Sequence, residues 1–172
     1  MPVLPRRSRA VLALGSNLPP RREWLEVALS VLAESSVEVV ARTPRWHTRP
    51  IGEVAQPDFL NQLLLAEGLQ QGREWLELAQ RAEDRAGRSR SVPKGPRRLD
   101  VDLILIEDEH WESADLTVPH PGLLLRPYLL RGAAQLVPTW VHPVEGQTIA
   151  ALARRLLTGS WGEPRSQQGR AD

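Results

Sequence analysis

The amino-acid sequence predicts an α+β fold, a ferredoxin-like antiparallel sheet with helices packed on it, in a single domain. Apolar runs and amphipathic segments follow one another as strand, helix, strand, strand, helix, strand, with further helices towards the carboxyl end. The 172 residues, 41% of them apolar and 25% charged, suffice for one hydrophobic core. No repeat or interior linker divides them, so we expect one domain over 10–158 and flexible tails at 1–9 and 159–172.

The first half of the chain holds three predicted strands and one helix. Residues 10–14 form an apolar run that a Gly-Ser-Asn turn at 15–17 ends. Two prolines, which a first helical turn tolerates, then precede apolar residues at helical spacing, and these predict a helix over 19–32. The β-branched run at 37–41, continuing towards Trp46, predicts the second strand, and 59–66 predicts the third.

The second half begins with another amphipathic helix after Gly72, which an arginine-rich loop at 87–96 follows. The most apolar strand of the chain, 100–106, comes next. The last predicted elements are a brief strand at 116–118, a helix over 123–136, a short sheet pairing at Trp140 and Val141, and a helix over 148–157 with Thr148 as N-cap.

Two aspartates open the strand at 100–106. Asp100 and Asp102 lie at i and i+2, so both side chains leave the same face, about 7 Å apart. Such a pair repels and is costly to desolvate unless a cation neutralises it, and Mg²⁺ is usually held by one or two carboxylates plus substrate phosphates. An Asp-x-Asp pair alone would more often be a turn cap and a solvated strand end. Arg97 and Arg98, immediately upstream, could meet phosphates and favour the metal interpretation.

A metal pair beside arginines indicates phosphoryl-type transfer. His120, held between two prolines, could donate to a phosphate oxygen or act as an acid or base, although a lone histidine there is more often a surface residue. The turn at 15–17 could approach a ligand closely, or could simply connect a strand to a helix. No Gly-Lys-Ser/Thr follows it, so side chains and metal would have to hold a nucleotide.

The aromatic residues give a second indication of a ligand. Phenylalanine and tyrosine occur once each, at Phe59 and Tyr128, and each lies near a candidate site loop. A flat heterocycle stacked between them is one interpretation, and two ordinary core residues are the other.

Bulk composition narrows the class of protein. The net charge of +1 gives no general argument for nucleic acid or an anionic membrane, and the absence of cysteine excludes disulfides and thiolate metal sites. The basic N-terminus is followed only by the apolar segment 10–14, which is too short for a signal-peptide core, and no apolar run is long enough to span a membrane. We therefore expect a cytoplasmic protein with no membrane or nucleic-acid partner.

In combination, these motifs resemble one family, the 6-hydroxymethyl-7,8-dihydropterin pyrophosphokinases of folate biosynthesis. The resemblance begins at Ala13-Leu-Gly-Ser-Asn17 and runs to the final helix. It includes Thr48-Arg-Pro-Ile-Gly52, Gln56-Pro-Asp-Phe-Leu-Asn61, Gly95-Pro-Arg-Arg-Leu-Asp-Val-Asp102 and Leu116-Thr-Val-Pro-His-Pro121. It implies a ferredoxin-like fold and transfer of the diphosphoryl group of ATP to the pterin hydroxymethyl group, releasing AMP. We expect such an enzyme to be a monomer.

The resemblance also implies roles for individual residues. Asp100 and Asp102 would bind two Mg²⁺ ions, and with Arg88 and Arg97 they would form the catalytic set. The pterin-binding residues would be Thr48, Arg49, Ile51, Phe59, Asn61 and Tyr128. The ATP-binding residues would be Gln80, Glu83, Arg88, Arg97, His120 and Arg126.

The sequence departs from the family pattern at two places. Pro93 replaces a basic residue two positions before the Gly-Pro-Arg motif, with Lys94 one place later, so either Arg90 or Lys94 could contact phosphate. Asp115 stands where some members have a basic residue near the nucleotide.

Two alternatives use the same residues. A non-catalytic, metal-dependent nucleotide- or RNA-binding module would use the basic stretch 85–98, and a different metal-dependent phosphotransferase would differ in its acceptor. An RNA-binding module would not need the Asp pair, His120, Asn61 and both aromatic residues together.

Overall fold

The computed structural model describes residues 6–52, 54–87 and 94–157. Its centre is a five-stranded sheet in which all pairings are antiparallel and four strands lie in the order β2-β4-β1-β5, with β3 also pairing with β4. The strands are β1 (Ser8–Ser16), β2 (Glu38–Arg42), β3 (Trp46–Thr48), β4 (Phe59–Gly68) and β5 (Asp100–Ile106). This order and the antiparallel pairing confirm the predicted ferredoxin-like sheet.

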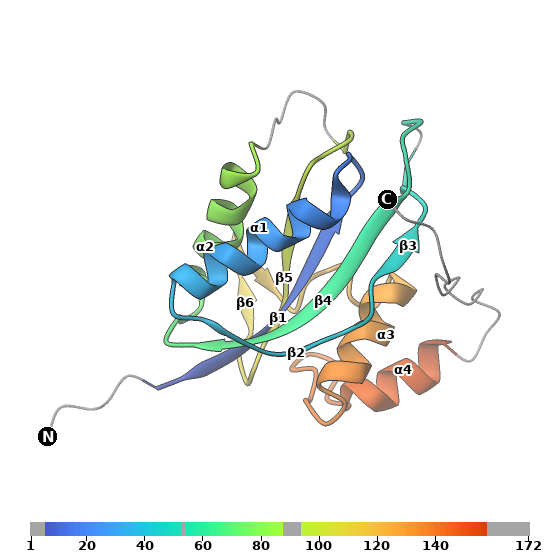
Figure 1. Cartoon of the computed structure of the whole chain (residues 1–172). Coiled ribbons are helices and arrows are strands. Elements are labelled where there is room, and N and C mark those ends of the chain that lie inside the picture. The colour runs from blue at the N-terminus through green and yellow to red at the C-terminus, as the bar shows by residue number, and fades with distance from the viewer. Residues whose placement is uncertain (1–5, 53, 88–93, 158–172) are drawn as a thin grey trace, which may run out of the picture.

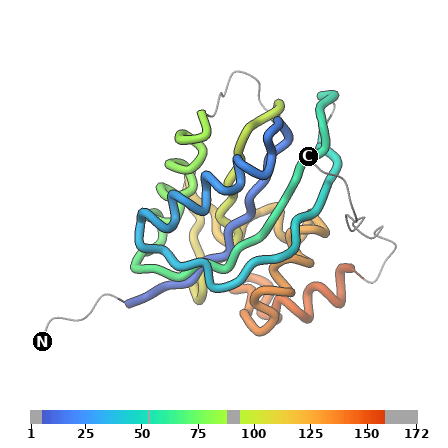
Figure 2. The backbone as a smooth tube through the Cα atoms, in the orientation of Figure 1, coloured from blue at the N-terminus to red at the C-terminus, as the bar shows by residue number. Residues whose placement is uncertain are grey.

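Helices cover both faces of the sheet (Figure 1). α1 (Arg21–Glu34) and α2 (Arg73–Arg85) share one apolar core with Leu12 and Leu14 of β1. α3 (Pro127–Leu136) and α4 (Ile149–Leu157) share a second core with Val11 and Ala13. Because successive strand residues face opposite sides and both sides are buried, residues 10–14 of β1 and 103–106 of β5 are continuous apolar runs. The tube in Figure 2 shows the same arrangement, with the sheet between the α1–α2 pair and the α3–α4 pair.

A small hairpin of β6 (Trp111–Glu112) and β7 (Thr117–Val118) forms a separate two-stranded sheet beside α2. A Cβ at Gly72 would lie 2.2 Å from the Trp111 ring, so this glycine lets the hairpin approach the start of α2. Asp115 forms an ion pair with Arg73 of α2. The predicted strand at 116–118 corresponds to β7, which pairs with β6 and not with the main sheet.

Three predicted boundaries are wrong. β1 begins at Ser8, which pairs with Gly68, so the predicted tail at 1–9 includes two strand residues. The predicted second strand is two strands, because Pro44, which lacks an N–H, separates β2 from β3. α3 begins at Pro127 instead of residue 123, since proline suits the first helical position and a turn precedes it.

The carboxyl-terminal segment differs from the prediction at one point and agrees at another. Val141 makes a bridge with Thr148, which lies just before α4, and so does not extend the sheet. The Thr148 hydroxyl accepts a hydrogen bond from the Ala151 N–H at 3.2 Å, which confirms it as the N-cap. Residues 1–5 and 158–172, where most of the predicted tails fall, lie outside the described residues. Among the described helices, none is long and apolar enough to cross a bilayer.

Candidate active site

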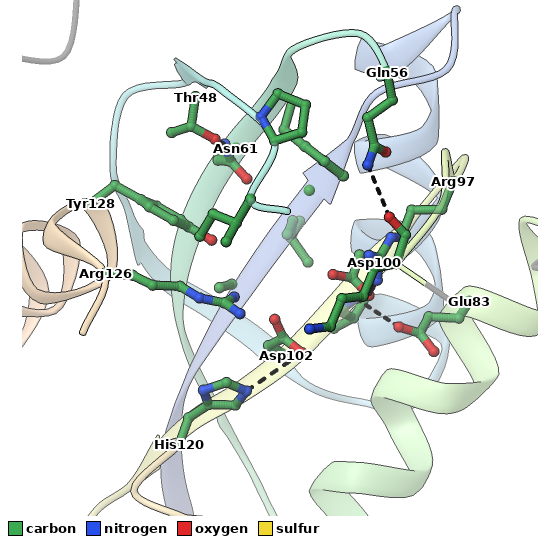
Figure 3. A pocket seen from close by; sticks show the side chains of 18 of the residues that line it. Thr48, Gln56, Asn61, Glu83, Arg97, Asp100, Asp102, His120, Arg126 and Tyr128 are labelled. Atoms are coloured by element: carbon green, nitrogen blue, oxygen red, sulfur yellow. Dashed lines mark hydrogen bonds and ion pairs between the residues drawn. The ribbon is translucent and has the colours of Figure 1, made fainter. Parts of the chain in front are cut away.

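A cavity of about 410 Å³ opens at one end of the sheet, where β1 ends and β4 and β5 begin. The sheet register brings three segments together there, because Gly15 pairs with both Asn61 of β4 and Asp100 of β5. The Gly-Pro-Arg loop, α2 and the segment before α3 complete the walls (Figure 3).

Gly15 forms part of the floor of the cavity. A Cβ at this position would lie 3.0 Å from Asn61 Oδ1 and 3.5 Å from the Phe59 ring. A Cβ there would press against Asn61 and make an ordinary van der Waals contact with Phe59, two predicted pterin-binding residues. The sequence left open whether the turn at 15–17 approaches a ligand or only connects a strand to a helix. The contact with Asn61 gives Gly15 a steric role at the site.

The two aspartates enter the cavity together. Arg97 Nη1 lies 3.0 Å from Asp100 Oδ1, and His120 Nε2 lies 3.8 Å from Asp102 Oδ1. Burial and the charge of Asp100 raise the pKa of Asp102 to about 7, although the Arg126 charge partly opposes the rise. The predicted like-charge pair on one strand face is thus present, and it holds one carboxylate that is costly to ionise.

The donor set fits a divalent cation. Two carboxylate groups face one cavity, and a bound cation would neutralise their charges. Hard divalent cations prefer oxygen ligands of this kind. Within residues 6–52, 54–87 and 94–157, no three His, Asp or Glu side chains gather into a complete metal cage. A bound Mg²⁺ would therefore need oxygen ligands from a phosphate or water in addition to Asp100 and Asp102.

His120 presents a hydrogen-bond donor to the cavity. The Gly122 N–H donates to Nδ1 at 2.9 Å, so the neutral ring carries its proton on Nε2, which faces Asp102. Burial and the nearby Arg126 charge lower the pKa of His120. The ring is therefore neutral near pH 7 and can donate to an anionic oxygen.

One wall of the cavity is made of aromatic and amide groups. The Asn61 amide donates to Thr48 Oγ1 at 2.7 Å, and only 4% of the Asn61 surface is exposed. The Arg97 guanidinium lies 5.7 Å from the centre of the Phe59 ring. Arg49 and Ile51 also line the cavity, and Tyr128 lies on the same side as Thr48 and Asn61 in Figure 3.

On the opposite side, α2 contributes Gln80 and Glu83 to the lining. Glu83 is 4% exposed, and its Oε1 accepts the Val101 N–H at 2.9 Å. Val101 lies between the two aspartates on β5, which is an edge strand of the main sheet. One carboxylate oxygen of Glu83 thus supports the strand that carries the two aspartates, a contact that the resemblance did not predict.

Sequence reasoning missed the residue that joins the loops. Asn17 is fully buried; its Nδ2 donates to Gln56 Oε1 at 2.9 Å and to Pro57 O at 3.1 Å, and its Oδ1 accepts the Arg97 N–H at 2.9 Å. Gln56 Nε2 in turn donates to Lys94 O at 2.9 Å. The available signal was an amide in a strand-to-helix turn, which favours side-chain bonding to nearby backbone.

The arginines next to the Asp strand separate. Arg97 lines the cavity, but Arg98 lies over the Trp24 ring at 5.2 Å, beside α1, and does not line the cavity. The prediction that both could meet phosphates is therefore wrong for Arg98. Lys94 also lines the cavity, whereas Arg88, Arg90 and Pro93 lie outside the described residues. Apart from Arg88, which lies outside the described residues, every residue to which the resemblance assigns a role lines this one cavity.

Known proteins share the sequence and the fold. The sequence model of the 7,8-dihydro-6-hydroxymethylpterin-pyrophosphokinase (HPPK) family matches residues 11–138. A 2-amino-4-hydroxy-6-hydroxymethyldihydropteridine pyrophosphokinase from Synechocystis is 35% identical over 153 residues, covering 88% of this chain and 78% of the relative. The protein of the same name from Bacillus subtilis is 34% identical over 128 residues, or 74% and 77% of the two chains.

Among solved structures, Plasmodium falciparum HPPK-DHPS with pterin and p-hydroxybenzoate superimposes with a TM-score of 0.64 at 13% identity. The match covers 88% of this chain and 43% of that longer one. At this identity the likeness shows the shared fold.

Proposed function

Because the chain belongs to the 7,8-dihydro-6-hydroxymethylpterin-pyrophosphokinase family, we propose that ATP and the pterin meet over Asp100 and Asp102 in the cavity at the end of the sheet. The protein is an ATP-dependent diphosphotransferase of folate biosynthesis. The pterin hydroxymethyl oxygen attacks the β-phosphorus of ATP. The bond from that phosphorus to the oxygen shared with the α-phosphate breaks, and AMP leaves with that oxygen while the hydroxyl proton is released.

The single observation that carries the placement is the pair of carboxylates facing one cavity. Asp100 and Asp102 would hold two Mg²⁺ ions there, with the remaining ligands from phosphate and water. Bound Mg²⁺ supplies charge neutralisation and polarises phosphoryl oxygens. The pKa of Asp102, raised to about 7, is consistent with a carboxylate that gains from a cation.

Three cationic or donor groups would hold the phosphates. Arg97 and Arg126 line the cavity on either side of the aspartates, and His120 offers its Nε2–H. Guanidinium groups bind phosphate oxygens with two donors at once, and their charge offsets the charge on the moving diphosphoryl group. Gln80 and Glu83 would lie beside the nucleotide, and Arg88, which lies outside the described residues, is proposed as a further phosphate ligand from the family motif.

The acceptor would bind against the other wall. Phe59 and Tyr128 offer two rings to a flat pterin, and Asn61 with Thr48, Arg49 and Ile51 offers polar groups to its edge. Holding the acceptor this way would place its hydroxymethyl oxygen towards the aspartates, so catalysis would rest mainly on positioning.

We also propose a cytoplasmic monomer with no nucleic-acid or membrane partner. Gel filtration can check the oligomeric state, and an RNA-binding assay can check the absence of a nucleic-acid partner.

The test of the site is AMP formation from ATP, Mg²⁺ and the hydroxymethyl dihydropterin. Asp100→Asn and Asp102→Asn should each lower turnover at least roughly 100-fold, because they remove carboxylate ligands, while circular dichroism shows the fold intact. Asp108→Asn, in the turn at the far end of β5, is the matched control and should keep wild-type turnover. Near-normal turnover in both site variants would refute the placement.

A further inference from the structure

The cavity contains the only lysine of the chain. Of the 22 lysine and arginine residues, 21 are arginine and one, Lys94, is lysine. Lys94 immediately precedes the Gly-Pro-Arg motif and lines the cavity together with Arg97, Asp100 and Asp102. A lysine side chain ends in an ammonium group, which is a compact charge with three donors and no acceptor. The cavity therefore holds a kind of cation that occurs nowhere else in this chain.

The backbone at Lys94 is held in an unusual conformation. Its φ is 57°, in the left-handed region that residues other than glycine rarely adopt. Lys94 O accepts a hydrogen bond from Gln56 Nε2 at 2.9 Å, and Gln56 Oε1 accepts one from the buried Asn17 amide. Three residues later, the Arg97 N–H donates to Asn17 Oδ1 at 2.9 Å. Both ends of the segment 94–97 are thus anchored to the same pair of amides, which compensates for the strained backbone at the cavity.

The ammonium group has no carboxylate partner among the described residues. Within 6–52, 54–87 and 94–157, Lys94 forms no ion pair, although two aspartates line the same cavity. Arg97 instead forms the ion pair with Asp100, at 3.0 Å. A cation at a cavity that lacks an internal partner remains available to a ligand anion, and phosphate oxygens bind ammonium groups through charge-assisted hydrogen bonds.

The position of Lys94 indicates which phosphates it would meet. Its carbonyl is bonded to Gln56, in the loop at 48–58 that carries proposed acceptor-binding residues, and Figure 3 shows Gln56 on the same side of the cavity as Arg97 and Asp100. Lys94 therefore lies where the acceptor-binding loop meets the aspartate strand. In the proposed placement, the two terminal phosphates of ATP lie between the aspartates and the acceptor, because these are the phosphates that are transferred.

We propose that the Lys94 ammonium binds the two terminal phosphates of ATP. This inference rests on the proposed placement of ATP over Asp100 and Asp102. Lys94 would supply a positive charge that the sequence lacks one position earlier, where Pro93 replaces the basic residue of the family pattern. The role belongs to this chain's own departure from that pattern, and it can be tested on one residue.

Because Lys94 is the only lysine, its accessibility can be measured directly. Brief treatment with an acetylating N-hydroxysuccinimide ester, followed by peptide mass spectrometry, compares Lys94 with the α-amino group of the N-terminus as internal reference. Mg²⁺-ATP at about ten times its dissociation constant should slow acetylation of Lys94 roughly tenfold, since only free enzyme then reacts. AMP, which lacks the two terminal phosphates, should at the same multiple of its own dissociation constant leave the rate within about twofold.

Two variants separate the charge of Lys94 from its shape. Lys94→Met keeps the length of the side chain without its charge, and calorimetric titration should show roughly 10- to 100-fold weaker binding of Mg²⁺-ATP, the range for a lost hydrogen bond between charged groups. Lys94→Arg keeps a phosphate-binding cation and should stay within about fivefold of wild type. Both variants should bind AMP and the pterin with wild-type affinity. Arg154→Met, which removes an exposed cation from α4, is the control for net charge and should bind Mg²⁺-ATP normally.

Three results would overturn the inference. The first is a Lys94→Met variant that binds Mg²⁺-ATP with wild-type affinity. The second is an equal effect on ATP and AMP, in the protection or in the titration, since this would place the ammonium away from the terminal phosphates. The third is a loss of affinity for the pterin alone. Failure of the underlying site is recognised separately, because Asp102→Asn would then retain turnover whatever Lys94→Met does.

Discussion

Asn17 Nδ2 lies 2.9 Å from Gln56 Oε1, and this hydrogen bond joins two loops whose residues are 39 positions apart. The same Asn17 accepts the Arg97 N–H, and the same Gln56 donates to Lys94 O. The loop at 48–58 and the Gly-Pro-Arg loop, which form two walls of the cavity, are therefore connected through two amides, one fully buried and one at the cavity lining.

Removing the buried amide of Asn17 should lower the stability of the fold. Asn17→Ala leaves the Arg97 N–H without its side-chain acceptor, and each buried unpaired group costs about 1–3 kcal/mol. We expect the melting temperature to fall by roughly 2–12 °C, given about 2–4 °C per kcal/mol for a chain of this size. Differential scanning calorimetry measures this, and an unchanged melting temperature would contradict the structural role.

The cavity-lining amide allows a more selective test. Gln56→Glu keeps Oε1 for the Asn17 bond but replaces the donor to Lys94 O, so only the link between the walls is lost. Steady-state kinetics should show higher KM values for both ATP and the pterin, with the melting temperature nearly unchanged. Gln135→Glu, an exposed change on α3, serves as control. An effect on the pterin KM alone would show that Gln56 acts on one wall only.

Glu83 is predicted to act through an acceptor oxygen towards β5. Glu83→Gln keeps an oxygen for the Val101 N–H, whereas Glu83→Ala leaves that buried N–H unpaired. We expect Glu83→Ala to lose about 1–3 kcal/mol of unfolding free energy and to bind Mg²⁺-ATP more weakly, while Glu83→Gln stays close to wild type. Urea denaturation and ATP titration measure the two effects. Equal losses in both variants would instead indicate that the charge of Glu83 matters.

The raised pKa of Asp102 predicts how pH changes stability in the absence of metal. A carboxyl whose folded pKa is about 7, against an ordinary value of 3.8, binds a proton in the folded state that the unfolded chain has already lost. Its contribution to stability is therefore complete below pH 4 and lost as pH rises to about 7.

Asp102→Asn removes this dependence, because an amide does not ionise. In EDTA, the variant should be more stable than wild type by at least about 1 kcal/mol at pH 8, and the difference should shrink towards pH 4. Mg²⁺ at pH 8 should raise the melting temperature of wild type but not that of Asp102→Asn. A difference that stayed constant with pH would show that Asp102 has an ordinary pKa.

Gly15 offers a steric prediction about the acceptor. Gly15→Ala places a methyl group 3.0 Å from Asn61 Oδ1, so the amide has to shift by a few tenths of an ångström, which strains its hydrogen bond with Thr48 and moves it relative to the acceptor. The pterin KM should rise roughly tenfold, as expected for a lost hydrogen bond, while the KM for ATP changes little. A normal pterin KM would show that Asn61 does not contact the acceptor.

The sequence by itself determined the local features. A period of two placed Asp100 and Asp102 on one strand face, apolar runs marked the strands and helices in their order, and the motif from 95 to 102 marked the phosphate side of the site. These features depend on residues close together in the chain. For that reason the order of the elements along the chain was predicted without knowledge of long-range contacts, whereas the roles of most cavity residues were implied by the family resemblance.

The tertiary structure alone decided which polar groups meet. Arg97 and Arg98 are adjacent in sequence, yet Arg97 faces Asp100 and Phe59 whereas Arg98 lies over Trp24 on α1. Asn17 with Gln56, and Glu83 with Val101, are joined only because the sheet register and the packing of α2 bring distant segments together. Hydrogen bonds of this kind require exact distance and direction between atoms, and those are set by the packed fold and not by any local pattern.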